Sequence, residues 1–186
     1  KIIEIVRGAK RKILNIIIKR EGDRIVNFKI PALSNIGKDK ILELLVESCS
    51  LAFIRQRPYN IIARPDRLPK SIFVSIHSTA PYAADYAFIL KNRMDEFQTG
   101  VDVMSRLIDK PVNLSIPHNC ESDFTSLQNV NIYKIKGAHP SGNESFQINR
   151  IDPLNSGEIV WVIKPEDLAN IRSEEHTSEL QSPLDI

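Results

Sequence analysis

The sequence predicts an α/β fold, in which a β-rich segment at residues 1–30 is followed by a parallel sheet covered by helices. Two observations support this prediction. Residues 1–30 are rich in Ile and Val and carry turn residues at intervals, as strands of a β-rich domain do. Beyond residue 37, short apolar runs alternate with segments of helical spacing, which is typical of a parallel sheet with crossover helices.

The overall composition is that of a globular protein of about one domain. The chain has 186 residues, of which 42% are hydrophobic and 26% charged. No apolar run approaches the roughly 20 residues of a membrane helix. Cys49 and Cys120 lie far apart and outside any CxxC spacing, so no zinc or iron–sulfur site is expected within the chain. A reducing, cytoplasmic setting is expected.

Positive charge is concentrated at the start of the chain. Residues 1–30 hold nine Lys or Arg and three Asp or Glu, whereas the net charge of the whole chain is +2. Such a cluster is either a solvated face or an attraction to acidic lipid or nucleic acid. The charges alternate with Ile in a strand-like way, which favours the solvated face, and no nucleic-acid partner is expected.

The first half of the chain is predicted to contain strands, one helix and a loop. Residues 1–30 form strands with turns at Gly8 and Gly22. Residues 37–53 change to helical spacing and form a helix. Residues 54–70 contain three prolines, which leave little room for a helix or a central strand, so a loop is predicted there.

The second half is predicted to supply most of the sheet. Residues 71–76, 111–116 and 130–135 are apolar strands, and residues 95–108 between the first two have the apolar face of a helix. Residues 117–129 are polar and are predicted to be a loop or a short helix.

Two further strands and a helix complete the predicted fold. Residues 145–151 and 158–163 are predicted to be strands joined by a turn at 152–157. Residues 164–171 then open a helix, with Pro165 in its first turn.

The last residues do not fit the predicted fold. Residues 172–182 read RSEEHTSELQS, which resembles the translation of a widely used sequencing-library adapter. Residues 172–186 are therefore interpreted as an artefactual tail that is disordered or packs on nothing, because they offer too little apolar surface to offset the entropy of ordering them.

Residues alone give no strong signal for a nucleotide or a catalytic site. The sequence contains neither GxGxxG nor GxxxxGK[ST]. His77 with Asp85, or His139 with Asp152, could do acid–base chemistry, but a loop or capping role is favoured for both pairs. Ser141 lies in PSGN and not in a GxSxG elbow.

Five motifs, in this order, resemble the A-subunit of the sodium-translocating NADH:quinone oxidoreductase, and together they cover essentially all of residues 1–171. They read VRGAKRKILNIIIK (6–19), RQRPYNIIARP (55–65), SIFVSIHSTAPYAADY (71–86), GAHPSGN (137–143) and IVWVIKPEDLANI (159–171). Any one of them is weak, but five in register are specific. The family chain is much longer than this one.

The resemblance implies a more detailed fold. Residues 1–30 would be the end of a β-rich barrel-sandwich domain, and residues 31–171 a Rossmann-like domain similar to the flavin- and NADH-binding subunit of respiratory complex I. That relative holds flavin phosphate in a glycine-rich loop, whereas residues 48–60 here contain no glycine. The flavin cradle is therefore expected to be filled in, and residues 137–143 are interpreted as a structural turn into the next strands.

Three short stretches of the sequence depart from the usual family pattern. They are Cys49-Ser50-Leu51 in place of Gly-Leu-Trp, Ser78 in place of Asp, and Glu144-Ser145-Phe146 in place of smaller residues. These differences affect the expected local loop geometry and leave the resemblance itself intact.

The resemblance also implies a function. The family complex passes electrons from NADH to quinone and pumps sodium, and its A-subunit is expected to be a peripheral, non-redox component on the cytoplasmic face of the bacterial inner membrane. No cofactor is expected in this chain; FAD, FMN, riboflavin and an iron–sulfur centre are implied in partner subunits. The implied partners are the other subunits, especially the quinone-binding membrane subunit, and ubiquinone or menaquinone.

Two alternatives remain open. One is a flavin- or NADH-binding electron-transfer subunit related to complex I or to a membrane-bound electron-transport complex. The other is a stand-alone soluble α/β enzyme that uses the loops after residues 76 and 116.

The candidate quinone or subunit contact is the segment that contains Arg55, Arg57, Pro58 and Tyr59. Pro58 biases Arg57 toward extended geometry, and residues two apart in an extended segment point the same way. Both guanidinium groups could therefore face one partner, while the Tyr59 ring could stack on a quinone. An ordinary basic surface loop is the competing interpretation.

Overall fold

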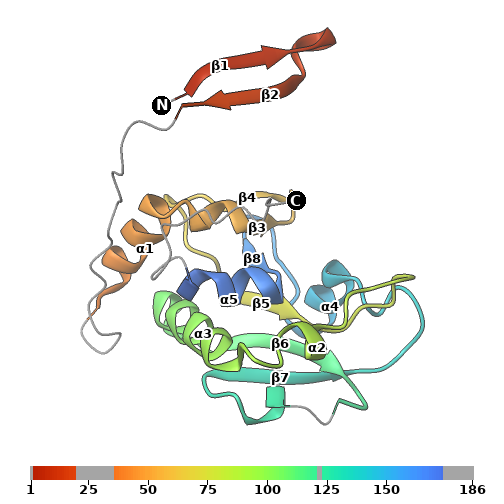
Figure 1. Ribbon diagram of the computed structural model, residues 1–186. Coiled ribbons are helices and arrows are strands. Elements are labelled where there is room, and N and C mark those ends of the chain that lie inside the picture. The colour runs from red at the N-terminus through yellow and green to blue at the C-terminus, as the bar shows by residue number, and fades with distance from the viewer. Residues whose placement is uncertain (1, 20–35, 121–122, 174–186) are drawn as a thin grey trace. The chain divides into compact units, whose positions relative to one another are not determined.

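The computed structural model describes residues 2–19, 36–120 and 123–173, which fall into two compact units (Figure 1). The first is a hairpin of β1 (Ile2–Arg7) and β2 (Ile13–Ile18), which pair antiparallel around Gly8 and a short 3₁₀ turn. Most of its large apolar side chains are exposed. The hairpin therefore buries no core of its own, as expected for two isolated strands.

The second unit contains a six-stranded sheet in the order β4-β3-β8-β5-β6-β7. Its strands are β3 (Ile54–Arg57), β4 (Ile61–Ile62), β5 (Ile72–Ser75), β6 (Val112–Pro117), β7 (Val130–Ile135) and β8 (Val160–Ile163). The four strands β8, β5, β6 and β7 are parallel, whereas β3 and β4 form an antiparallel hairpin against β8. The predicted parallel sheet is thus confirmed for its main part, and the structure adds an antiparallel edge.

Alternating side chains of each strand face two different layers. Ile72 and Val74 of β5 belong to the larger core, whereas Phe73 between them packs with Ile148 in a smaller one. The larger core lies under α1 (Lys38–Glu47), α3 (Met94–Ile108) and α5 (Pro165–Ser173), and α3 makes its most extensive helix contact with α5. The smaller core lies under α4 (Glu144–Ile151).

The sequence pattern predicts a loop at residues 54–70, and this prediction is wrong, because these residues contain the β3–β4 hairpin. The prolines flank the two strands instead of interrupting them: Pro58 lies in the turn, and Pro65 and Pro69 follow β4. β3 then pairs with β8, which fully buries Ile54. Tertiary pairing with a distant strand therefore outweighs the local proline signal.

Residues 145–151 are also predicted wrongly, because they form helix α4 and not a strand. The side chain of Asn143 caps the helix by accepting a hydrogen bond from the amide of Ser145 at 2.9 Å. Gln147, Ile148 and Ile151 then face the protein at helical spacing. Residues 137–143 accordingly form a turn, as predicted, but the turn leads into a helix.

Most of the remaining elements agree with the sequence pattern, although the short helix α2 (Tyr86–Ile89) was not predicted. The helices predicted at 37–53, 95–108 and 164–171 are α1, α3 and α5, although α1 ends earlier and α5 extends to Ser173. The first two residues assigned to the artefactual tail thus belong to α5, and the rest of that tail lies outside the described residues. Within the described part of the chain, no helix has the length and apolar character needed to span a bilayer.

Candidate functional site

The carboxyl ends of parallel strands form the edge at which open α/β proteins bind ligands. Each of the four parallel strands ends at this edge, and three of the segments that follow them are considered together: residues 77–85 after β5, residues 136–143 after β7, and the start of α5 after β8. We call these three segments the carboxyl-edge site. Its chemistry depends on whether its helix ends are open to an anion, because free backbone amides at a helix N-terminus bind phosphate.

The first helix after β5 has its N-terminal amides occupied by its own chain. This helix is α2 (Tyr86–Ile89), and Asp85 precedes it. One Asp85 carboxylate oxygen accepts hydrogen bonds from the amides of Ala87 at 3.0 Å and Phe88 at 3.2 Å. A phosphate at this position would have to displace a carboxylate.

Acidic side chains also occupy the N-terminus of α5. Glu166 and Asp167 lie in its first turn. Burial raises the pKa of Tyr86, and the charge of Glu166 and a hydrogen bond to it raise the pKa further. Burial and then Glu166 likewise raise the pKa of Asp167. Lys164, directly before this turn, acts on the pKa of Asp167 in the opposite direction. The first turn of α5 thus carries two carboxylates beside one lysine.

Gly142 allows the β5 loop and the β7 turn to lie against each other. The Gly142 amide donates to Thr79 Oγ1 at 3.3 Å, and this oxygen lies 3.3 Å from His139 Nδ1. Since Thr79 Oγ1 accepts from the amide, its own hydrogen can donate to His139. A Cβ at position 142 would overlap the backbone N of Thr79, so a glycine is required for this close approach.

A second pair of side chains joins the same two segments. Ser141 Oγ donates to the carbonyl O of Gly137 at 2.8 Å and lies 3.3 Å from His77 Nε2. Because a hydroxyl carries one hydrogen, Ser141 accepts from His77 and His77 does not act as its base. Burial lowers the pKa of His77. We call His77, Thr79, His139, Ser141 and Gly142 the loop–turn junction.

Asp85 and Asp152 form hydrogen bonds with other groups and not with the two histidines. Asp85 caps α2, and Asp152 accepts from Ser71 Oγ at 2.7 Å. Among the described residues, no hydrogen bond joins His77 to Asp85 or His139 to Asp152. The loop and capping roles favoured by the sequence are thus the ones observed.

The predicted contact residues lie on the β3–β4 hairpin. Arg55 and Arg57 are on β3 with Gln56 between them buried, so they share one face, as predicted. Arg55 is exposed, but Arg57 donates to Glu144 of α4 at 2.9 Å, and its side chain is only 20% exposed. Arg57 therefore fastens β3 to α4 and is not free to face a partner.

Pro58 and Tyr59 form the tip of this hairpin. The Arg57–Pro58 peptide bond is cis, and Tyr59 is 78% exposed. Arg55, Pro58 and Tyr59 are thus the members of the predicted set that are exposed, whereas Arg57 is half-buried. Sequence reasoning missed Glu144 as the partner of Arg57, since the two residues lie 87 positions apart.

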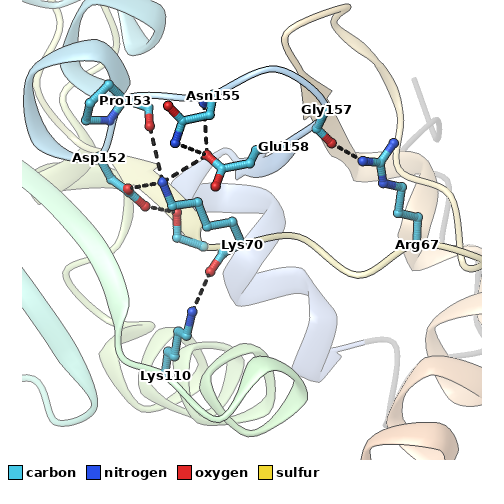
Figure 2. A network of polar contacts seen from close by, with 9 residues as sticks. Arg67, Lys70, Lys110, Asp152, Pro153, Asn155, Gly157 and Glu158 are labelled. Atoms are coloured by element: carbon cyan, nitrogen blue, oxygen red, sulfur yellow. Dashed lines mark hydrogen bonds and ion pairs between the residues drawn. The ribbon is translucent and has the colours of Figure 1, made fainter.

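The opposite, amino edge of the sheet carries a polar network centred on Lys70 (Figure 2). Lys70 Nζ lies 2.6 Å from Asp152 and 3.1 Å from Glu158. Hydrogen bonds to these two carboxylates raise the pKa of Lys70. Both carboxylates belong to the connection between α4 and β8, so the network holds that connection against the start of β5.

A polar cleft of about 560 Å³ lies at the C-terminal end of α3. Asp102 and Asp109 face it together with Arg106 and Lys110, so its charges balance. Within the described residues, no cluster of His, Cys, Asp and Glu has a composition able to hold a metal ion. The carboxyl-edge site and the hairpin tip therefore remain the two candidate functional surfaces.

Comparison with known proteins matches residues 36–173 to the family described as NqrA second alpha/beta domain. Relatives named as the A-subunit of Na(+)-translocating NADH-quinone reductase occur in Haemophilus influenzae, Glaesserella parasuis and Neisseria gonorrhoeae. They are 31%, 32% and 30% identical to this chain over 97%, 96% and 92% of its length. The chain spans about two fifths of these relatives, at 41%, 41% and 39% of their length.

Proposed function

The chain belongs to the A-subunit family of the Na(+)-translocating NADH-quinone reductases, and from this premise we propose that it is a non-redox, structural and quinone-associated part of such a complex. It is peripheral, on the cytoplasmic face of the bacterial membrane, beside the quinone-binding membrane subunit. FAD, FMN, riboflavin and the iron–sulfur centre reside in partner subunits, and ubiquinone or menaquinone is the acceptor.

The acidic residues at the starts of α2 and α5 support the non-redox part of this proposal. Asp85 accepts hydrogen bonds from the amides of Ala87 and Phe88 in α2, and Glu166 and Asp167 lie in the first turn of α5. Dinucleotide and flavin sites instead offer free amides and glycines to the phosphate. The geometry thus favours a retained scaffold over a working cofactor site.

The strand order supports a Rossmann-like relationship for this scaffold. If β5 is counted as the first parallel strand, then β6 is the second, β7 the third and β8 the fourth. Across the sheet from β7 to β8 their order is 3-2-1-4, which is the order of the first four strands of a dinucleotide-binding fold. We therefore propose that the domain derives from a nucleotide-binding fold whose phosphate positions are filled by its own carboxylates.

The purified full-length subunit is expected to bind neither flavin nor NADH, because Asp85 would have to leave α2 and the charge of Glu166 opposes a phosphate. Titration calorimetry with NADH and with FMN should give dissociation constants weaker than about 1 mM. Stoichiometric flavin absorbance, or saturable NADH binding in the micromolar range, would instead support the electron-transfer alternative.

Quinone association is proposed for two exposed residues of the β3–β4 hairpin, Arg55 on β3 and Tyr59 at the tip. A cation and a flat aromatic ring suit a quinone ring and its carbonyl oxygens, or a carboxylate on the neighbouring subunit. Arg57 supports the tip by its ion pair with Glu144. The stand-alone enzyme is less well supported, because His77 donates to Ser141 and does not activate it.

Replacing Arg55 and Tyr59 together by alanine in the full-length subunit is expected to raise the apparent quinone KM of the complex about tenfold, as loss of two central contacts does. NADH oxidation by an artificial electron acceptor should continue, because that step lies upstream of quinone. Arg64→Ala is the matched control, since Arg64 is exposed and pairs only locally with Asp66. If the quinone kinetics and the assembly of the complex are both unchanged in the double variant, the β3–β4 hairpin is an ordinary surface loop.

A further inference from the structure

Two histidines join the loop after β5 to the turn after β7 in a reciprocal way. His77 belongs to the loop, and its Nε2 lies 3.3 Å from Ser141 Oγ of the turn. His139 belongs to the turn, and its Nδ1 lies 3.3 Å from Thr79 Oγ1 of the loop. Each segment thus supplies one imidazole and one hydroxyl to the loop–turn junction, so the two segments are held together by two histidine contacts.

The hydrogen bonds around His139 require a neutral imidazole. Thr79 Oγ1 accepts a hydrogen bond from the Gly142 amide, and its own hydrogen is directed to His139 Nδ1. Nδ1 must therefore carry a lone pair and no hydrogen. A proton added at Nδ1 would place two hydrogens between the ring and the Thr79 hydroxyl, so protonation of His139 opposes the contact as it stands.

His77 is disfavoured as a cation for a different reason. Its ring is half-buried beside Ser141, which is only 6% exposed. Ser141 Oγ donates to the carbonyl O of Gly137 and accepts from His77 Nε2, a contact that the neutral ring already satisfies. A proton on His77 would add positive charge where water is partly excluded, and burial accordingly lowers the pKa of His77.

Ionisable groups on the neighbouring segments do not compensate this charge. They are Asp85 of the β5 loop, His118 after β6, Tyr133 of β7, Lys136 of the turn and Glu144 of α4. The carboxylate of Asp85 is bonded to the amides of α2, and that of Glu144 is paired with Arg57. Among the described residues, no carboxylate forms an ion pair with His77 or His139. Burial, and not a neighbouring charge, thus sets the direction in which the pKa of His77 is shifted.

We propose that the loop–turn junction is a pH-sensitive switch, in which neutral His77 and His139 hold the β5 loop against the β7 turn and protonated histidines release it. The proposal does not depend on the proposed function, because it concerns contacts within this chain. Release would free residues 77–85 and 136–143, so the surface at the carboxyl edge would differ between neutral and mildly acidic pH.

The direction of the pH dependence follows from the closed state binding fewer protons. The pKa of His77 is lowered in the closed junction, whereas an exposed imidazole in an open junction has a pKa of about 6.5. The closed junction therefore has its full stability above about pH 6.5 and loses stability as the pH falls below that value. At one pH unit below it, a histidine that stays neutral when closed shifts the equilibrium toward the open state by up to about tenfold.

Hydrogen exchange of the full-length subunit at about pH 7.5 and about pH 5.5, corrected for the intrinsic effect of pH on exchange, measures the opening. Protection of the amides of residues 137–143, which include the Gly142 amide of the junction, is expected to be about tenfold lower at the acidic pH. Amides of β6 and α3 should keep their protection. Equal protection of residues 137–143 at both pH values would overturn the proposal, as would an equal loss of protection in β6 and α3.

Replacing both histidines by neutral side chains of similar shape is expected to abolish the pH dependence. In the variant His77→Gln with His139→Asn, an amide nitrogen takes the place of Nε2 and an amide oxygen takes the place of Nδ1, so both hydrogen bonds are retained without a titrating group. His118→Gln is the matched control, because His118 is exposed and lies outside the junction. A tenfold pH dependence that persists in the double variant would overturn the proposal.

The titration of His77 in the unmodified subunit provides a test that needs no variant. Exchange of the imidazole Cε1 hydrogen, followed by mass spectrometry across the pH range, gives the titration midpoint of His77 in the folded subunit and in the subunit unfolded in urea. The midpoint is expected at lower pH in the folded subunit, because burial disfavours the charged ring. An equal or higher midpoint in the folded subunit would overturn the proposal, whatever the double variant does.

Discussion

Replacing Gly142 by alanine is expected to separate the β5 loop from the β7 turn. The new Cβ would overlap the backbone N of Thr79 and approach the Ser78 carbonyl carbon to 2.8 Å. Because backbone cannot rotate aside as a side chain can, the loop itself must move. Such overpacking costs about 1–3 kcal/mol, and it removes the hydrogen bonds of the loop–turn junction.

Hydrogen exchange of the full-length subunit measures this effect. Amides of residues 77–82 and 137–142 should exchange roughly ten- to a hundredfold faster in the variant, while amides of β6 and α3 stay unchanged. Gly37→Ala is the control, since nothing lies within 4 Å of a Cβ at that position. Unchanged exchange in both loops would show that they are not held together at Gly142.

Replacing Gly100 by alanine is expected to destabilise the packing of α3 on α5. In a helix interior, glycine to alanine usually stabilises by roughly 1 kcal/mol. Here the sign is reversed, because the Cβ would overlap the carbonyl O of Leu168 and lie 3.0 Å from its Cγ. Leu168 and Ala169 are fully buried, so α5 must move off α3 at a net cost of about 1–3 kcal/mol.

Proteolysis and hydrogen exchange of α5 report this change. Amides of α5 should exchange about five- to a hundredfold faster in the Gly100→Ala variant, whereas β6 should be less affected. Thr99→Ala is the matched control on the neighbouring residue of the same helix, where alanine adds no volume. If Gly100→Ala raised stability as helix propensity alone predicts, the close contact with Leu168 would be wrong.

These two glycines have the same structural role. Gly142 lets two loops meet, and Gly100 lets two helices meet. Both glycines thus serve close packing within the chain.

Local patterns predicted most of the fold. β7 at 130–135 and α3 at 95–108 were identified within one residue at each end, because their apolar residues recur at the spacing of a strand or of a helix. The same rule failed at 145–151, where Phe146 and Ile148 alternate as in a strand. The capping side chain of Asn143 was the signal that could have identified the helix.

The candidate site was predicted less completely than the fold. Arg55 and Arg57 were correctly placed on one face of an extended segment, but their different surroundings could not be predicted. Arg57 is paired because α4, far along the sequence, brings Glu144 to it.

The sequence by itself determined the α/β class, the family and the absence of a glycine-rich phosphate loop, because these depend on residue types and on spacings of a few positions. Only the tertiary structure decided that Lys70 meets Asp152 and Glu158 and that Gly142 meets Thr79. Lys70 and Gly142 meet partners more than 60 positions away in the sequence. Such contacts form only when strands and helices pack in one arrangement, which local periodicity does not specify.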